Sequence, residues 1–274
     1  MCRHLVWLGE QPRTLAELVT VPPHGLYEQS WAPRRQRYGT VNADGFGLGW
    51  YPPAGPPARY RRAVPVWADP NLPDLARALR STAVLAAVRD ATPGTSQDET
   101  AAAPFAAGDW LFSHNGAVPD WESLPADTGW PLDAAALLRL EARCDSALLW
   151  AVLAARLAAG EEPGEALAAV VRQTAAVRPT ARLNLLATDG RRIAATRWGD
   201  TLWYRTGDGE VLVASEPDDT PGPWHEVPDR SVLLATARTV AITPLDPLDP
   251  LSPPAPTQPT TPDPDPHLDL ERTP

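Results

Sequence analysis

The order of the predicted strands and helices is the feature that most limits what this chain can fold into. Strand-like runs dominate both ends of the sequence, and helical runs gather in the middle. This order lacks the regular strand–helix alternation of a doubly wound parallel sheet, so it favours an α+β arrangement in which helices flank sheets. Strands are predicted over residues 4–8, 45–51, 84–89, 110–112, 183–188, 192–198, 211–214 and 232–234, and helices over 72–80, 133–142, 146–159 and 163–175.

One domain and a tail account for the whole chain. Residues 1–243 carry all of these predicted elements. Residues 244–274 contain eleven prolines and few large apolar side chains. Such a segment cannot bury enough surface to offset the entropy lost on ordering, so it is predicted to be a disordered Pro/Asp-rich tail. The alternative is an extended arm that docks on the domain or on a partner.

Charge and hydropathy exclude several classes of function. The net charge is −10 and the sequence has no basic patch, so nucleic acid is not an expected partner. No apolar run reaches the roughly 18 residues of a membrane span, and no secretory signal is visible, so we expect no membrane association and a cytoplasmic location. All 24 basic residues are arginine, which excludes lysine chemistry such as a Schiff base.

The two cysteines, Cys2 and Cys144, are interpreted separately, because a cytosolic disulfide between them is not expected. Cys2 follows the initiator methionine, which is normally removed before so small a residue. Cys2 would then carry a thiol and a free α-amine, and the amine can accept the thiol proton, as in enzymes with N-terminal threonine nucleophiles. Taken alone, a cysteine at position 2 is more often accidental, so this signal by itself is weak.

Five sequence blocks strengthen the catalytic interpretation. They are residues 1–5 (Met-Cys-Arg-His-Leu), 42–51 (Asn-Ala-Asp-Gly-Phe-Gly-Leu-Gly-Trp-Tyr), 87–94 (Ala-Val-Arg-Asp-Ala-Thr-Pro-Gly), 112–116 (Phe-Ser-His-Asn-Gly) and 144–146 (Cys-Asp-Ser). In order and spacing they resemble the class II glutamine amidotransferases, a branch of the N-terminal-nucleophile hydrolases. The opening block resembles one subgroup, the γ-glutamyl hercynylcysteine sulfoxide hydrolases of ergothioneine biosynthesis. The resemblance covers residues 1 to about 240 and implies a four-layer αββα sandwich.

Asn115 and Gly116 offer a side-chain amide and a backbone N–H, the two kinds of donor that an oxyanion hole requires. The resemblance implies that they stabilise the tetrahedral intermediate formed by the Cys2 thiolate. The alternative is that Asn-Gly forms a hairpin turn after a strand. His114 is interpreted as a buried supporting histidine rather than a general base, since the α-amine already supplies the base.

Arg89 ends an apolar predicted strand, where a fork of fixed donors suits bidentate binding of a carboxylate. The resemblance implies that Arg89 and Thr92 hold the substrate α-carboxylate. The alternative is an ion pair between Arg89 and Asp90. Several amidotransferases have a histidine where Pro93 stands here, so any contact made by that histidine is absent or replaced.

Asp145 precedes a clear helix start, so it could serve as a helix cap. The resemblance implies instead that Asp145 binds the substrate α-ammonium, which charge complementarity with a glutamyl zwitterion favours. Cys144 is expected to be a small buried residue. Residues 42–51 are interpreted as a turn that enters a core strand, with close backbone approach at its glycines and Trp50 packed beneath the site.

The leaving group decides the function, because these residues would bind any γ-glutamyl amide. No acceptor domain follows residue 243, so we expect a hydrolase that removes glutamate from γ-glutamyl hercynylcysteine sulfoxide, a small-molecule substrate. One tryptophan could face its trimethylammonium group. No metal or cofactor is implied. The alternatives are a glutaminase subunit that supplies ammonia to a separate synthetase, and a non-catalytic γ-glutamyl-binding protein.

Overall fold

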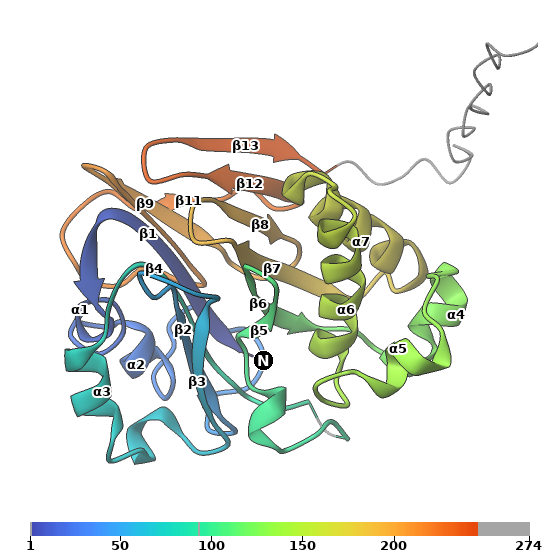
Figure 1. Cartoon of the computed structure of the whole chain (residues 1–274), viewed down its shortest axis with the longest axis horizontal. Coiled ribbons are helices and arrows are strands. Elements are labelled where there is room, and N and C mark those ends of the chain that lie inside the picture. The colour runs from blue at the N-terminus through green and yellow to red at the C-terminus, as the bar shows by residue number, and fades with distance from the viewer. Residues whose placement is uncertain (1, 93, 246–274) are drawn as a thin grey trace, which may run out of the picture.

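Two antiparallel sheets form the centre of the protein (Figure 1). The computed structural model describes residues 2–92 and 94–245. Along the seven-stranded sheet the order is β11 (His225–Glu226), β9 (Trp203–Gly207), β10 (Glu210–Ala214), β1 (Arg3–Thr14), β4 (Arg80–Val88), β2 (Phe46–Trp50) and β3 (Ala58–Arg62). Along the six-stranded sheet it is β13 (Val240–Pro244), β12 (Ser231–Ala235), β8 (Ile193–Arg197), β7 (Arg182–Thr188), β6 (Trp110–Ala117) and β5 (Phe105–Ala107).

Helices cover the outer face of each sheet, and Figure 1 shows the two groups on opposite sides of the molecule. Against the seven-stranded sheet lie α1 (Leu15–Val19), α2 (Leu26–Gln29) and α3 (Leu72–Ala78). On the six-stranded side lie α4 (Leu124–Thr128), α5 (Ala134–Leu138), α6 (Asp145–Ala158) and α7 (Pro163–Val177). Short helical turns occur at Val66–Ala68, Glu99–Ala101 and Trp121–Ser123. The predicted α+β class and its four αββα layers are confirmed.

Strand β1 shows how the sequence specifies these layers. Leu5 and Trp7 pack into the core beneath α1–α3, whereas Val6 and Leu8 pack into the core between the two sheets. Successive side chains of a strand point to opposite faces, so a strand buried on both faces is apolar at every position. This explains why the run at residues 5–8 is continuously apolar rather than alternating.

Each of the eight predicted strands coincides with a strand of the structure, although their ends differ. The strands missed are β3, β5, β9, β11 and β13. Of these, β5 and β11 have only three and two residues, and β3, β9 and β13 contain no buried residue. The helix predicted over residues 133–142 is wrong in length: Asp133 caps it, but it ends at Leu138, which is 87% exposed. A helix that buries so little of its apolar face has little packing to extend it.

The fold continues slightly beyond the predicted domain boundary. Pro244 pairs with Ser231 in the β12–β13 ladder, and Leu245 is buried with its N–H donating to the Arg230 carbonyl at 2.7 Å. The rest of the predicted tail, residues 246–274, lies outside the described residues. Within the described ranges, no helix has both the length and the apolar character needed to cross a membrane.

The glycines of β2 permit close approach between layers, as the sequence predicts. A Cβ atom on Gly47 would lie 2.2 Å from the carbonyl oxygen of Ala103, in the segment that leads into β5. A Cβ on Gly164, in the first turn of α7, would instead meet the movable tip of Leu234 at 3.2 Å.

We predict that Gly47→Ala lowers the free energy of unfolding by about 1–3 kcal/mol, because backbone atoms must move to admit the methyl group. Gly164→Ala is the matched control, and it should be neutral or stabilising by up to about 1 kcal/mol, because alanine favours helix. Urea denaturation of both variants measures the difference. Equal effects of the two substitutions would contradict this account of β2.

Candidate active site

Cys2 lies at the end of the central strand of the seven-stranded sheet. The next residue, Arg3, pairs with Val88, so Cys2 is placed where β4 runs out into Arg89. The Cys2 side chain is partly buried. Burial raises the pKa of its thiol, while a hydrogen bond with the Asp90 backbone and the positive charge of Arg89 act in the opposite direction. The thiol therefore needs a base before it can attack.

The predicted base is the α-amine freed by removal of Met1. Met1 lies outside the described residues, so this base remains a prediction. The other cysteine, Cys144, is buried in the core beneath α6, and burial raises the pKa of its thiol to about 12. The expectation of a small buried residue is confirmed, and Cys2 is the accessible thiol of the pair.

Asn115 and Gly116 lie inside β6, where they pair with Asn184 and Leu183 of β7. The hairpin-turn alternative is therefore wrong. The Asn115 side chain is fully buried, and its Nδ2 donates to Ser215 Oγ at 3.3 Å. Ser215 Oγ also accepts the backbone N–H of His4 at 3.0 Å, two residues after Cys2. The Ser215 hydroxyl thus ties the Asn115 amide to the strand that carries the nucleophile.

Gly116 lies against the backbone of β7. A Cβ there would lie 1.9 Å from the Arg182 carbonyl oxygen and 2.6 Å from His114 Nε2. Only glycine fits, and the backbone N–H of Gly116 is not screened by a side chain of its own.

His114 is buried with both ring nitrogens engaged. Its Nε2 lies 2.9 Å from the Arg182 carbonyl oxygen, which can only accept, so Nε2 carries a proton. Its Nδ1 is 3.0 Å from Ser146 Oγ and 4.0 Å from a carboxylate oxygen of Asp145. The interpretation of His114 as a supporting histidine agrees with this geometry, which leaves no nitrogen to act as base for Cys2.

Arg89 is 7% exposed, and only part of its guanidinium is satisfied. Nη2 donates to Thr95 Oγ1 at 3.1 Å and to the Ser96 carbonyl at 2.7 Å. Nη1 is buried and has no hydrogen-bond partner among the described residues. Nη2 is therefore held by protein acceptors, and Nη1 is available to donate to a buried anion.

Thr92 is exposed, and its carbonyl accepts from the N–H and the hydroxyl of Thr95. Thr95, rather than Thr92, provides the hydroxyl that contacts Arg89. The assignment of Thr92 to the carboxylate site remains a prediction. Pro93, at which the sequence departs from several amidotransferases, lies outside the described residues.

Asp145 is the first residue of α6 and is 7% exposed. The cap position itself belongs to Cys144. One Asp145 oxygen accepts the Val118 N–H at 3.0 Å, and the other accepts the Ser146 N–H at 2.8 Å. The carboxylate therefore joins the end of β6 to the start of α6. Oδ1 also accepts from the Ser146 hydroxyl at 3.4 Å, so Oδ2 is the oxygen that retains a lone pair for a substrate cation.

Arg89 and Asp145 lie near enough to Cys2 for their charges to act on the pKa of its thiol, and Asn115 is linked through Ser215 to the strand that begins after Cys2. Asp44 holds this end of β4: its N–H donates to the Arg89 carbonyl at 2.9 Å, and its carboxylate accepts the Ala91 N–H at 2.8 Å.

Trp50 does not lie beneath the site. It pairs with Val84, whereas Phe46 at the other end of β2 pairs with Val88 beside Arg89. The expectation for Trp50 is wrong, because β2 runs away from the thiol.

Ser215 and Thr95 are the functional-site neighbours that sequence reasoning missed. The signal for Ser215 was a small polar residue directly after the apolar run at 211–214.

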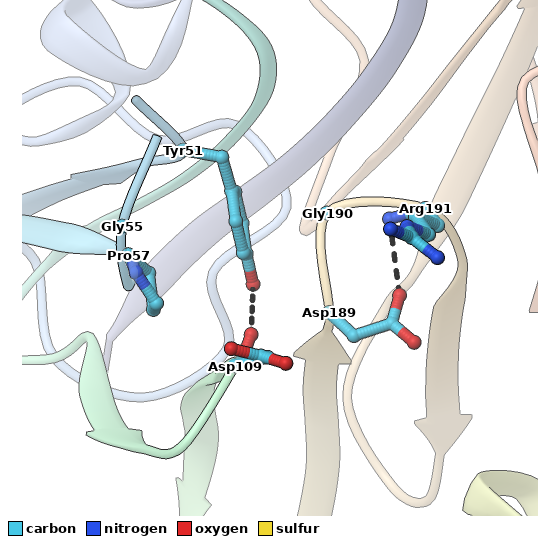
Figure 2. Close-up of a pocket in the computed structure, with 7 residues that line it drawn as sticks. All are labelled: Tyr51, Gly55, Pro57, Asp109, Asp189, Gly190 and Arg191. Atoms are coloured by element: carbon cyan, nitrogen blue, oxygen red, sulfur yellow. Dashed lines mark hydrogen bonds between the residues drawn. The ribbon is translucent and has the colours of Figure 1, made fainter. Parts of the chain in front are cut away.

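A hollow of about 340 Å³ lies elsewhere, at the far ends of β6 and β7 (Figure 2). It is lined by Tyr51, Gly55, Pro57, Asp109, Asp189, Gly190 and Arg191. The Tyr51 hydroxyl lies 2.9 Å from the Asp109 carbonyl and 2.6 Å from that of Thr188. Asp109 precedes β6 and Thr188 ends β7, so this hollow is separated from Asn115 by the length of both strands. No group of side chains suited to a metal ion occurs in the described part of the chain.

Comparison with known proteins identifies the family of the chain. The family model of class-II glutamine amidotransferases matches residues 26–208. A γ-glutamyl-hercynylcysteine sulfoxide hydrolase of Mycolicibacterium smegmatis is 45% identical over 247 residues, which cover 89% of this chain and 100% of that protein. One of the same name from Mycobacterium tuberculosis (strain CDC 1551 / Oshkosh) is also 45% identical, over 90% of this chain and 97% of its own length.

Among solved structures, a glutamine aminotransferase class-II domain protein from Silicibacter pomeroyi superposes with a TM-score of 0.64 over 90% of this chain and 100% of its own, at 23% identity. This likeness concerns the fold, and the predicted N-terminal-nucleophile hydrolase type of sandwich is confirmed. The chain belongs to the class-II glutamine amidotransferase family.

Proposed function

We propose that this protein hydrolyses the γ-glutamyl amide bond of γ-glutamyl hercynylcysteine sulfoxide, with Cys2 as nucleophile, and so acts in ergothioneine biosynthesis. The observation that carries the proposal is 45% identity to hydrolases named for that substrate, along their whole length. The grouping of Arg89 and Asp145 around the thiol supports the same reaction, because these charges suit the two ends of a glutamyl zwitterion. A cytoplasmic location is part of this proposal.

Substrate binding uses the two buried charges. The free Nη1 of Arg89 takes the α-carboxylate, which gives that nitrogen the partner it lacks. The Asp145 carboxylate takes the α-ammonium with the lone pairs not used by Val118 and Ser146. The γ-carbonyl carbon of the substrate then lies at the thiol.

Bond cleavage follows in two stages. The α-amine of Cys2 accepts the thiol proton, and the thiolate adds to the γ-carbonyl carbon, whose oxygen becomes an anion held by the second N–H of the Asn115 amide and by the Gly116 N–H. Collapse of this intermediate breaks the C–N bond, and the amine leaves with the proton from the α-amine. Water adds to the γ-glutamyl thioester in the same way, which releases glutamate and restores the thiol.

We predict that Cys2→Ala lowers kcat at least about a thousand-fold, because no other group can form the thioester. Cys144→Ala is the matched cysteine control and should retain activity. Iodoacetamide should label Cys2 and leave Cys144 unmodified, because Cys144 is buried and its thiol pKa is raised to about 12. Intact-mass spectrometry should show Met1 absent from the active protein; full activity with Met1 retained would refute the mechanism.

For Asp145→Asn we predict an increase in KM for the γ-glutamyl substrate of roughly 30-fold or more, which corresponds to about 2 kcal/mol for a buried charge that loses its partner. Asp133→Asn is the control, because Asp133 also begins a helix but is exposed and belongs to α5. Steady-state kinetics and thermal melting separate the two roles. A lowered melting temperature with an unchanged KM would assign Asp145 to helix capping.

The identity of the leaving group is tested by release of free glutamate from γ-glutamyl hercynylcysteine sulfoxide and, separately, from glutamine. We predict that kcat/KM for the sulfoxide exceeds that for glutamine. Faster turnover of glutamine would favour ammonia supply to a separate synthetase. Glutamate from neither substrate would favour the non-catalytic binding protein.

A further inference from the structure

A loop beside the active site is closed on itself and firmly held. We call residues 30–42 the rim loop. At its neck the Asn42 N–H donates to the Ser30 carbonyl at 2.6 Å. The buried Asn42 side chain donates from Nδ2 to the same carbonyl at 3.4 Å and to Gln36 Oε1 at 3.0 Å. The ends therefore meet, and the residues between them form a compact surface loop of the kind that commonly carries function.

Glu216 anchors the rim loop to the residue that follows the nucleophile. Its fully buried carboxylate accepts the backbone N–H groups of Arg34 at 2.9 Å and Arg35 at 2.7 Å. It also lies 2.7 Å from His24 Nε2 and 3.6 Å from the guanidinium of Arg3. Arg3 is covalently attached to Cys2, so one buried carboxylate fixes both the loop and the start of β1.

Side chains of the rim loop add contacts outside this anchor. The Arg34 guanidinium forms a bidentate pair with Asp219, at 2.7 and 3.0 Å. Arg35 lies over the ring of Trp203, 5.7 Å from its centroid. These contacts hold the base of the loop, and its tip takes a defined position.

The tip of the rim loop contacts two residues whose backbones touch the proposed site. Gly39 lies against Asp90, because a Cβ on Gly39 would be 2.1 Å from Asp90 Oδ2, and the Asp90 backbone hydrogen-bonds with Cys2. Tyr38 stacks on the guanidinium of Arg182, whose Cζ is 4.1 Å from the ring centroid. The carbonyl of Arg182 is the atom pressed against Gly116. The tip therefore spans from the carboxylate-binding end of β4 to the oxyanion side.

Tyr38 is held in place yet remains 54% exposed. Asp200 fixes its partner from below, because Arg182 Nε donates to Asp200 Oδ2 at 3.1 Å. A large aromatic ring that is ordered but half exposed contributes little to the stability of the fold. Its exposed surface can bind a flat or cationic group.

We propose that Tyr38 is the specificity residue for the leaving amine, and that the rim loop selects γ-glutamyl amides whose amine carries a ring or a quaternary ammonium group over glutamine, whose leaving group is ammonia. This inference rests on the proposed γ-glutamyl hydrolase function. The glutamyl part occupies Arg89 and Asp145, and the oxyanion occupies Asn115 and Gly116. The side of the site that neither the glutamyl part nor the oxyanion occupies is the one that the rim loop covers. The leaving amine departs there.

The test compares three substrates: γ-glutamyl hercynylcysteine sulfoxide, L-γ-glutamyl-p-nitroanilide and glutamine. For each, kcat/KM is measured with wild type, Tyr38→Leu and Tyr38→Phe. Tyr38→Leu should lower kcat/KM for the first two substrates about tenfold more than for glutamine. Tyr38→Phe retains the ring and should keep the wild-type ratio among the substrates.

Trp110→Leu is the matched control, because Trp110 also stacks with an arginine, Arg192 at 5.6 Å, but lies at the opposite end of β6 from Asn115. It should change kcat/KM for all three substrates by a common factor. The same common factor for Tyr38→Leu, or no effect of Tyr38→Leu on any substrate, would overturn the assignment of Tyr38.

Failure of the proposed function is distinguishable from failure of this inference. If wild type prefers glutamine to the sulfoxide, the proposed function is wrong, and the ratio between the p-nitroanilide and glutamine still decides the role of Tyr38. If wild type releases glutamate from none of the three, both are overturned.

Discussion

The pairing of β1 with β4 is the constraint on which the site depends. β1 lies between β10 and β4, so both of its edges are hydrogen-bonded. Its side chains enter two different cores, with Trp7 on one face and Val6 and Leu8 on the other. A slip of one residue would exchange these faces and force Trp7 into the narrow space between the sheets. The register is thereby fixed by burial, and the place of Cys2 beside Arg89 follows from it.

Two polar groups of this site, Arg89 Nη1 and Asn115 Oδ1, are buried with no hydrogen-bond partner among the described residues. Each such group costs about 1–3 kcal/mol in the folded protein. Under the proposed binding of the α-carboxylate, Arg89 Nη1 would gain the hydrogen-bond partner that it lacks, and this would contribute to the binding free energy of the substrate. The rigid contacts of Thr95, Ser96 and Ser215 keep these groups from turning elsewhere.

The sequence predicted an α+β arrangement and its apolar strands, because doubly buried strands and Ala/Leu-rich helices leave strong local patterns. The four-layer sandwich was implied by the family resemblance. It could not predict β9 or β13, whose residues are mostly polar or exposed and which form only because a neighbouring strand offers hydrogen bonds. The helix predicted over residues 133–142 was too long for the opposite reason. Its residues favour a helix locally, but little packing supports the helix beyond Leu138. Motif spacing indicated Cys2, Arg89, Asn115 and Asp145, and geometry was needed to reject the Asn-Gly turn, because an Asn-Gly pair in a strand and one in a hairpin look alike.

Residues that bind only the γ-glutamyl part of a substrate cannot distinguish between substrates that all contain this part. Arg89 and Asp145 would bind glutamine and a γ-glutamyl conjugate alike, so discrimination has to come from groups that contact only the amine. Those groups need a scaffold that is fixed relative to the thiol but is not itself part of the charge pair. Glu216 provides such a scaffold, because it binds the rim loop and Arg3 with one carboxylate. A loop anchored in this way can change the residue at position 38 without disturbing the nucleophile, and substrate preference can then diverge while the chemistry is retained.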